Sequence, residues 1–156
     1  MHNKKRFFLI PIISIIIVFI LMYNHMSYSH NKYVDINDLV NKSYTSSQGY
    51  DSYISKHMSK EVYNSSNGYI TYKNFECKKP IKISLKLTEI NQHKINRKIF
   101  VYMKYDLDLI DAEGKSVSRS RNIPVVFTVL KNNNDFYIEN KQEYEEGINQ
   151  VPNIYK

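Results

Sequence analysis

The sequence predicts an α+β fold: an N-terminal transmembrane helix, then two helices packed on a curved antiparallel sheet of four or so strands. Three observations predict it. An uncharged apolar run covers residues 7–23, and apolar residues recur at three- and four-residue steps between residues 35 and 63. From residue 69 onward the apolar period changes to two, which is typical of strands. The expected parts are a cytoplasmic basic tag (1–6), a transmembrane anchor (7–23), a tether (24–32), an extracytoplasmic α+β domain (33–142) and a polar tail (143–156).

The apolar run of residues 7–23 is long enough to cross a bilayer. A helix of this length rises about 26 Å, against a hydrocarbon core about 30 Å thick. Thirteen of its seventeen residues are Ile, Leu, Phe or Val, and their transfer into lipid favours insertion. The side chains expected to hold the anchor in lipid include Phe7, Ile10, Ile13, Ile16, Ile17, Phe19, Ile20 and Tyr23.

Charge around the anchor predicts its orientation. Lys4, Lys5 and Arg6 precede it, and the next charged residue is Lys32. The positive-inside rule therefore keeps the N-terminus cytoplasmic and places the rest outside, as a single-pass protein of the cell membrane. The alternative is a cleaved signal peptide. We favour the uncleaved anchor, because the best cleavage candidate, residues 27–29, lacks the usual small-residue pattern. Both interpretations export residues 24–156.

Two helices are expected next. The first begins at Asp35, which with Asp38 resembles a capping box. Residues 45–49 are typical of a break, and the second helix covers residues 50–63 before another break at 64–68. The apolar stripes of the two helices consist of Ile36, Leu39, Val40 and Tyr44, and of Tyr50, Tyr53, Ile54, Met58 and Val62.

The remainder is expected to form the sheet. Residues 69–75 form a weak strand, and alternation of apolar and polar residues predicts strands at 81–88 and 101–109. Further strands are expected at 117–130 and 136–141, with turns at 91–97, 111–114 and 132–135. Pro124 lies inside one of these strands, where it requires a bulge or an edge position.

Residues 50–63 (YDSYISKHMSKEVY) and 125–139 (VVFTVLKNNNDFYIE) carry a resemblance to a known family. With the order of elements over residues 33–142, they resemble the cone-shaped, cystatin-related domains of the nuclear-transport-factor-2-like family. The resemblance implies a sheet curved around helices, whose interior serves family members as a ligand pocket, an active site or a core. It also implies a cell-envelope protein of Gram-positive type, in which one anchor often precedes such a domain.

The net charge and the cysteine content limit which partners and cross-links are expected of this chain. The net charge is +7, of which residues 1–6 supply +3, so the exported part carries +4. This mild excess favours anionic surroundings such as a membrane surface, while export argues against nucleic acid as a partner. The single cysteine, Cys77, excludes an internal disulfide. The residues proposed to contact an anionic surface are Lys73, Lys78, Lys79, Lys82 and Lys86, and the basic region continues through Lys94, Arg97 and Lys98.

No catalytic residue, cofactor site or metal ligand is expected. The five histidines lack metal-ligand spacing, and His57, on the second predicted helix, is expected to be structural. Asp106 and Asp108 lie about 7 Å apart along one strand face, a spacing that could suit a glycosidase. That face also carries Lys104 and is predicted to be solvated.

These observations favour a membrane-anchored extracytoplasmic binding or assembly domain without catalytic activity. The alternatives are a component of a conjugation or type IV secretion complex, and an enzyme that uses the interior of the cone. The expected partner is the lipid bilayer, with other envelope proteins or a second copy of the chain as further candidates.

Overall fold

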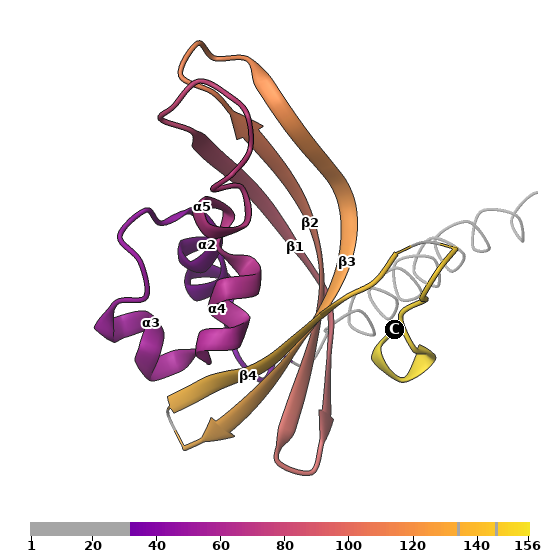
Figure 1. Cartoon of the computed structure of the whole chain (residues 1–156). Helices are drawn as coiled ribbons and strands as arrows, with labels where there is room; N and C mark the ends of the chain where they lie inside the picture. Colours follow the sequence, from indigo (N-terminus) through magenta and orange to yellow (C-terminus); the bar gives the residue numbers. More distant parts are fainter. Residues whose placement is uncertain (1–31, 134, 146) are drawn as a thin grey trace, which may run out of the picture. The chain divides into compact units, whose positions relative to one another are not determined.

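The computed structural model describes residues 32–133, 135–145 and 147–156. They belong to one unit, Lys32–Lys156, in which helices lie on one side of an antiparallel sheet (Figure 1). The predicted anchor at residues 7–23 lies outside the described residues. Within the described part of the chain, no helix combines the length and the apolar character that crossing a membrane requires.

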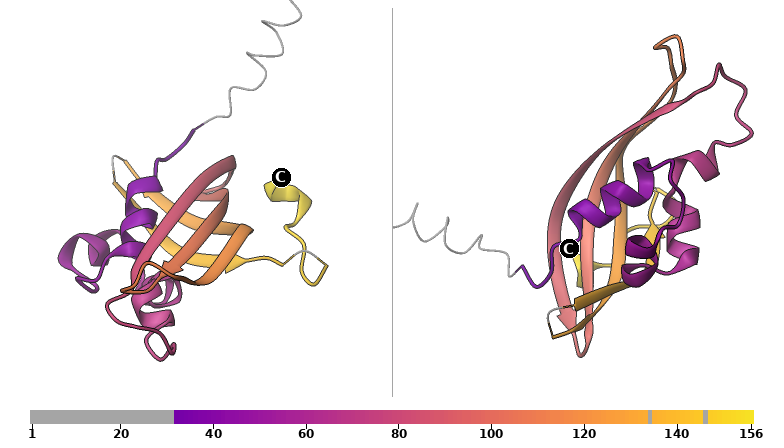
Figure 2. Two further views of the ribbon diagram at one scale, coloured as in Figure 1. Left: turned by 90° about the horizontal axis from the view of Figure 1, so that it is seen from above. Right: turned by 90° about the vertical axis from the view of Figure 1, so that its left-hand side faces the viewer.

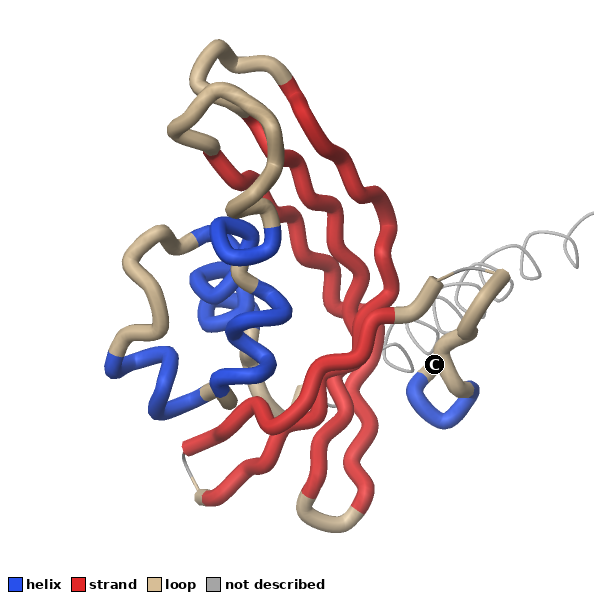
Figure 3. The backbone as a smooth tube through the Cα atoms, in the orientation of Figure 1, coloured by secondary structure: helices blue, strands red, loops and turns tan. Residues whose placement is uncertain are grey.

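The sheet is a meander of antiparallel neighbours in the order β1-β2-β3-β4 (Figure 3). Its strands are β1 (Lys82–Ile95), β2 (Lys98–Ile110), β3 (Ser116–Asn132) and β4 (Asp135–Glu143). The sequence-based prediction of an α+β fold with an antiparallel sheet of about this size is therefore confirmed. The turn expected at 91–97 is narrower than predicted, because β1 continues to Ile95 and pairs there with Lys98.

The described helices are α2 (Asn37–Thr45), α3 (Ser52–His57), α4 (Lys60–Ser66) and α5 (Gly68–Thr71). They lie together on the same face of the sheet, as the views from above and from the side show (Figure 2). α2 confirms the first predicted helix, but it begins at Asn37 and its N-cap, Ile36, makes no side-chain cap hydrogen bond, so the capping box expected at Asp35 and Asp38 is wrong. The single second helix predicted for residues 50–63 is wrong, since α3 and α4 are separate.

Pairing with β4 breaks the predicted second helix. Met58, fully buried, forms a parallel β-bridge with Ile138 of β4. The next backbone N–H, that of Ser59, donates to the Ile138 carbonyl at 3.0 Å. The Ser59 hydroxyl then accepts from the N–H of Val62 and caps the start of α4. Contacts to a strand some eighty residues away therefore override the local helical pattern.

The weak strand predicted for residues 69–75 is also wrong, because α5 occupies its first part. Asn67, which is buried, caps α5 by accepting from the N–H of Ile70 at 3.1 Å. Its amide nitrogen donates to the carbonyls of Ser43 and Ser46, at 2.8 and 2.9 Å. Asn67 thus fixes α5 against the end of α2, and these contacts favour a helical turn at the start of the predicted strand.

Apolar side chains from both layers fill the space between the helices and the sheet. Burying each large one contributes about 1.5–3 kcal/mol relative to exposure. The largest fully buried members include Leu39, Ile54, Met58, Tyr63, Met103 and Phe127. The interior of the fold is a packed core at these positions.

The opposite face of the sheet carries a smaller apolar cluster. Tyr144 and Val151, which follow β4, are buried there against Tyr102 and Val126. Tyr155, in the short 3₁₀ helix η1 (Asn153–Tyr155), stacks on Phe100 with ring centroids 4.8 Å apart. The part of the chain expected as a polar tail therefore lies on the sheet, on the side away from the helices (Figure 1).

Pro124 is accommodated next to a bulge in β3. The pairing of β2 with β3 shifts between Tyr105 and Leu107, where Asn122 takes a positive φ of 56°. The Pro124 carbonyl accepts from the N–H of Tyr144 at 2.8 Å, directly after the last paired residue of β4. The missing N–H of proline thus falls where the β4 ladder ends, as the sequence requires.

Candidate functional site

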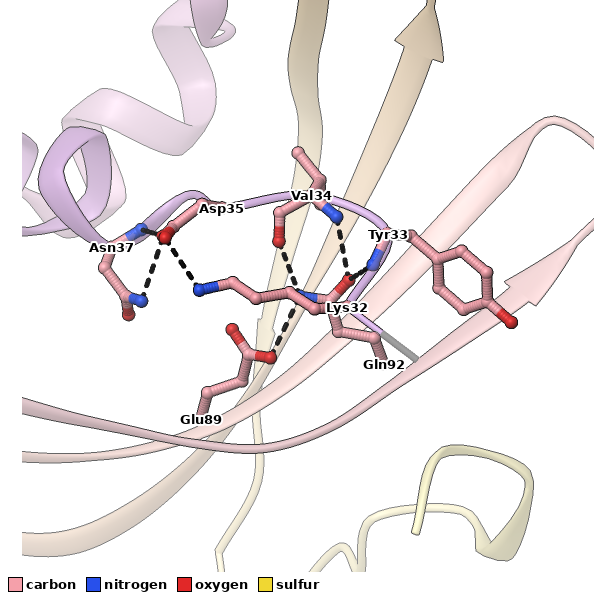
Figure 4. A network of polar contacts seen from close by, with 7 residues as sticks. All are labelled: Lys32, Tyr33, Val34, Asp35, Asn37, Glu89 and Gln92. Atoms are coloured by element: carbon pink, nitrogen blue, oxygen red, sulfur yellow. Dashed lines mark hydrogen bonds and ion pairs between the residues drawn. The ribbon is translucent and has the colours of Figure 1, made fainter. Parts of the chain in front are cut away.

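Residues 32–35, the first described segment, are fastened to β1 by a single side chain, Gln92 (Figure 4). The side-chain oxygen of Gln92, Oε1, accepts from the backbone N–H groups of Tyr33 and Val34 at 2.8 and 3.0 Å. Its amide nitrogen donates to the Val34 carbonyl at 2.6 Å and to Glu89 Oε1 at 2.9 Å. Gln92 is only 5% exposed. We call this arrangement the Gln92 cluster.

A bulge in β1 places Gln92 on the helix side of the sheet. Up to Glu89, alternate residues such as Leu85 and Leu87 pack on the core. The register then shifts between Glu89 and Asn91, so that Gln92 pairs with the buried Val101. Because side chains alternate along a strand, Lys94 lies on the same face as Gln92. Without the bulge, strict alternation counted from residue 81 would have placed Gln92 and Lys94 on the outer face of the sheet.

Two further contacts hold residues 32–35. The Lys131 ammonium, on β3, donates to the Tyr33 carbonyl at 2.6 Å. Lys32 and Asp35 form an ion pair of 2.7 Å, in which the hydrogen bond raises the pKa of Lys32 and lowers that of Asp35. Asp35 also accepts from the backbone N–H of Asn37 at the start of α2. The chain is therefore fixed to the sheet before its first helix begins.

A basic cleft lies between the β1–β2 turn and the β3–β4 turn, next to this segment. Its volume is about 280 Å³. The lining residues are Lys94, Asn96, Arg97, Lys131 and Asn133. All five are exposed, three are cationic and none is acidic. We call it the hairpin cleft. A larger cleft of about 580 Å³ adjoins it and shares Lys131 and Asn133 with it.

Nearby carboxylates are paired with other cations. Asp35 is paired with Lys32, and Glu139 with Lys98 at 2.8 Å. Asp135 contacts the Lys56 ammonium at 3.2 Å, and this hydrogen bond lowers the pKa of Asp135. In the part of the chain that the structure describes, no ion pair joins Lys94 or Arg97 to a carboxylate. Their charge remains available to an anion.

His57 lies close to this region and ties α3 to the start of β4. Its Nε2 lies 3.1 Å from Asp135 Oδ1, and its Nδ1 lies 2.8 Å from the Tyr53 carbonyl. The ring also packs beside Tyr53 and Phe136. These contacts agree with the structural role that the sequence suggested.

The lysines proposed from sequence to contact an anionic surface lie elsewhere. Lys73, Lys78 and Lys79 belong to the segment between α5 and β1, where Lys78 is paired with Glu113. Lys82 and Lys86 alternate with core residues and therefore lie on the outer face of β1. Their contact with an anionic surface stays a prediction.

The structure divides the single basic region expected from sequence. Lys82 and Lys94 lie at opposite ends of β1, twelve residues apart, or about 40 Å along an extended strand. Lys94 and Arg97, at one end of the region, line the hairpin cleft, whereas Lys82, at the other end, does not. Lys131, which completes the cleft, was not predicted, because its position beside Arg97 depends on the order of the strands.

A polar cluster that the sequence did not predict joins α2, β2 and β4. Glu143 accepts from the Tyr105 hydroxyl at 2.9 Å and lies 2.9 Å from the Lys141 ammonium. Lys141, whose side chain is 5% exposed, also donates to the Ser65 carbonyl at 2.7 Å. Burial lowers the pKa of Lys141 and raises the pKa of Tyr44 and Tyr105. These groups satisfy one another, so the cluster serves to hold the layers together.

The aspartates of β2 hold the bulge of β3. Asp108 lies 2.6 Å from the Arg121 guanidinium, and Asp106 accepts from the N–H of Asn122 at 2.8 Å. Cys77 is a free thiol. Among the described residues, no group of three or more His, Cys, Asp or Glu side chains is placed to hold a metal ion.

In comparisons with known proteins, no family model matches the chain, and neither a curated protein nor a solved structure matches it. The hairpin cleft, with the Gln92 cluster beside it, is therefore identified as the candidate site on its geometry and charge alone.

Proposed function

We propose that this protein is a membrane-anchored extracytoplasmic binding or assembly domain, built on a nuclear-transport-factor-2-like fold. The observation that carries the proposal is the attachment of residues 32–35 to β1 through Gln92. Helices on one face of a curved antiparallel sheet support the family resemblance.

The attachment fixes the place at which the folded domain meets its tether. Residues 24–31 separate it from the apolar run, and at full extension they reach about 30 Å. An anchor at residues 7–23 would therefore keep the Gln92 side of the domain within about 30 Å of the lipid surface. This arrangement suits a protein that binds or assembles at the membrane.

The positions of the polar groups favour a binding function over a catalytic one. Apolar side chains fill most of the space between helices and sheet, where the related fold would hold an active site. The polar groups found there, those of Tyr44, Tyr105, Lys141 and Glu143, are bonded to one another. Clefts that contain charged side chains lie outside this space, at the turns and on the outer face of the sheet beside the segment that follows β4. Surface clefts of this kind suit the binding of a charged partner.

Membrane fractionation of full-length protein with a carboxyl-terminal tag tests the anchor. We expect the protein to resist alkaline extraction, and the tag to be digested by protease added to intact cells. Ile16→Lys combined with Ile20→Lys should release the protein from the membrane, because each central Lys costs about 3 kcal/mol in insertion. A wild-type protein found soluble in the cytosol would overturn the proposal.

A further inference from the structure

We propose that the hairpin cleft binds the phosphate groups of anionic lipids in the membrane that holds the anchor. This inference rests on the proposed function and names the surface with which the domain would meet the bilayer. The partner is identified by its chemistry, a negatively charged phosphate at a lipid surface.

The charge of the cleft fits an anion. Lys94 and Arg97 come from one hairpin and Lys131 from another, so cationic groups converge from two sides. Asn96 and Asn133 add amide groups that can donate hydrogen bonds to phosphate oxygens. Because the lining contains no carboxylate, no negative charge in the cleft would repel a bound phosphate.

The position of the cleft favours a lipid source for that phosphate. Lys94 is two residues from Gln92 along β1, and Lys131 contacts the carbonyl of Tyr33 directly. The point at which the tether joins the domain therefore borders the cleft. Cations gain from an anionic surface only within about a Debye length, so those beside the tether are the best placed.

The basic residues at the other end of β1 provide a matched control. Lys82 and Lys86 are exposed lysines on the same strand, but they lie on its outer face. Lys86 also stands opposite Asp106 in the register of β1 with β2. Neutralising them removes the same amount of charge without altering the cleft.

The test uses the full-length chain reconstituted into vesicles of phosphatidylcholine, with or without phosphatidylglycerol. A fluorophore at His93→Cys, in a Cys77→Ser background, reports the end of β1 next to the cleft. A fluorophore on native Cys77 reports the segment between α5 and β1. Lipids that carry a quencher in the headgroup region measure how closely each position approaches the surface.

We expect phosphatidylglycerol to increase quenching at position 93 and to leave it unchanged at position 77. Lys94→Gln combined with Arg97→Gln should lower the ratio of docked to undocked domain about 25-fold, since each cation near an anionic surface contributes roughly fivefold. Lys82→Gln combined with Lys86→Gln should keep the wild-type response, whereas the sequence-based prediction that these two lysines contact an anionic surface requires them to lose it, so the test decides between the two surfaces.

Three results would overturn the inference while the protein stays in the vesicles. These are equal quenching with and without phosphatidylglycerol, an equal loss in the control pair, or full reversal by inorganic phosphate at constant ionic strength. The last would assign the cleft to a free phosphate. Failure of the chain to enter vesicles would instead remove the proposed function, and the two failures are therefore distinguishable.

Discussion

Gln92 and Val34 exchange two hydrogen bonds, one from the Val34 N–H to the Gln92 oxygen at 3.0 Å and one from the Gln92 nitrogen to the Val34 carbonyl at 2.6 Å. The side chain of Gln92 thus pairs with a backbone as a neighbouring strand would. A side-chain amide can do this from one position because it carries a donor and an acceptor on two separate atoms.

Gln92→Ala is expected to lower the free energy of unfolding by about 2 kcal/mol, because partly buried backbone groups lose their partners. Urea unfolding measures the change, and hydrogen exchange at residues 33 and 34 should accelerate. His93→Ala, at the next and exposed position, is the control and should change stability little. Equal urea midpoints for the two variants would contradict the role given to Gln92.

Stability is expected to fall above pH 10. Burial raises the pKa of Tyr44 and Tyr105 above their ordinary value of 10.0. At these two positions the folded state therefore keeps protons that the unfolded chain releases as the pH rises. Each should reduce the free energy of unfolding by about 1.4 kcal/mol per pH unit. Lys141 acts in the opposite direction below 10.5, since burial lowers its pKa.

Comparison of variants isolates the tyrosine contribution to this slope. Tyr105→Phe should remove the contribution of Tyr105 and make the slope shallower than that of the wild-type protein. Urea midpoints measured across the alkaline range provide the slopes. An unaltered slope in Tyr105→Phe would show that its hydroxyl ionises as freely in the folded state as in the unfolded one.

Gly68→Ala is expected to destabilise the domain by about 1–3 kcal/mol, as overpacking does. An added Cβ would overlap the Cδ1 atom of Ile83, which belongs to the neighbouring β1. Ile83→Val removes that atom at a cost of about 0.5–1.5 kcal/mol. The double variant should therefore lose less stability than the two single changes together, as thermal unfolding of all three would show. Strict additivity would refute this packing argument.

Tyr155→Ala is expected to loosen the segment that follows β4. The stacking of Tyr155 on Phe100 is worth about 0.5–1.5 kcal/mol beyond the area that it buries. Limited proteolysis should then cut after residue 144 sooner, while the sheet itself stays resistant. Ile154→Ala, which changes an exposed neighbour, should be cut at the wild-type rate.

The local sequence pattern predicted helices and strands correctly where local preferences and tertiary contacts favour the same structure. Alternation at residues 81–88 and 101–109 places Ile83 opposite Leu109, as the register shows. The sequence pattern gave wrong predictions where contacts with distant residues determine the local structure. The break at Met58 depends on Ile138, and the turn of α5 depends on polar contacts between Asn67 and the end of α2.

The candidate site was predictable only in part. Lys94 and Arg97 stood out as members of a basic region, but the bulge after Glu89 decides that Lys94 faces the helix side. Lys131 joins them through strand order, and Gln92 carries no signal that distinguishes it from any polar residue in a turn. A one-residue bulge is invisible to a count of alternating residues.

The fastening of residues 33 and 34 to Gln92 also decides how the domain would respond to mechanical force. A pull applied through the tether reaches three hydrogen bonds that end on one side chain before it reaches α2. Those bonds share the load, so the first helix stays in place under tension that would otherwise peel it from the sheet.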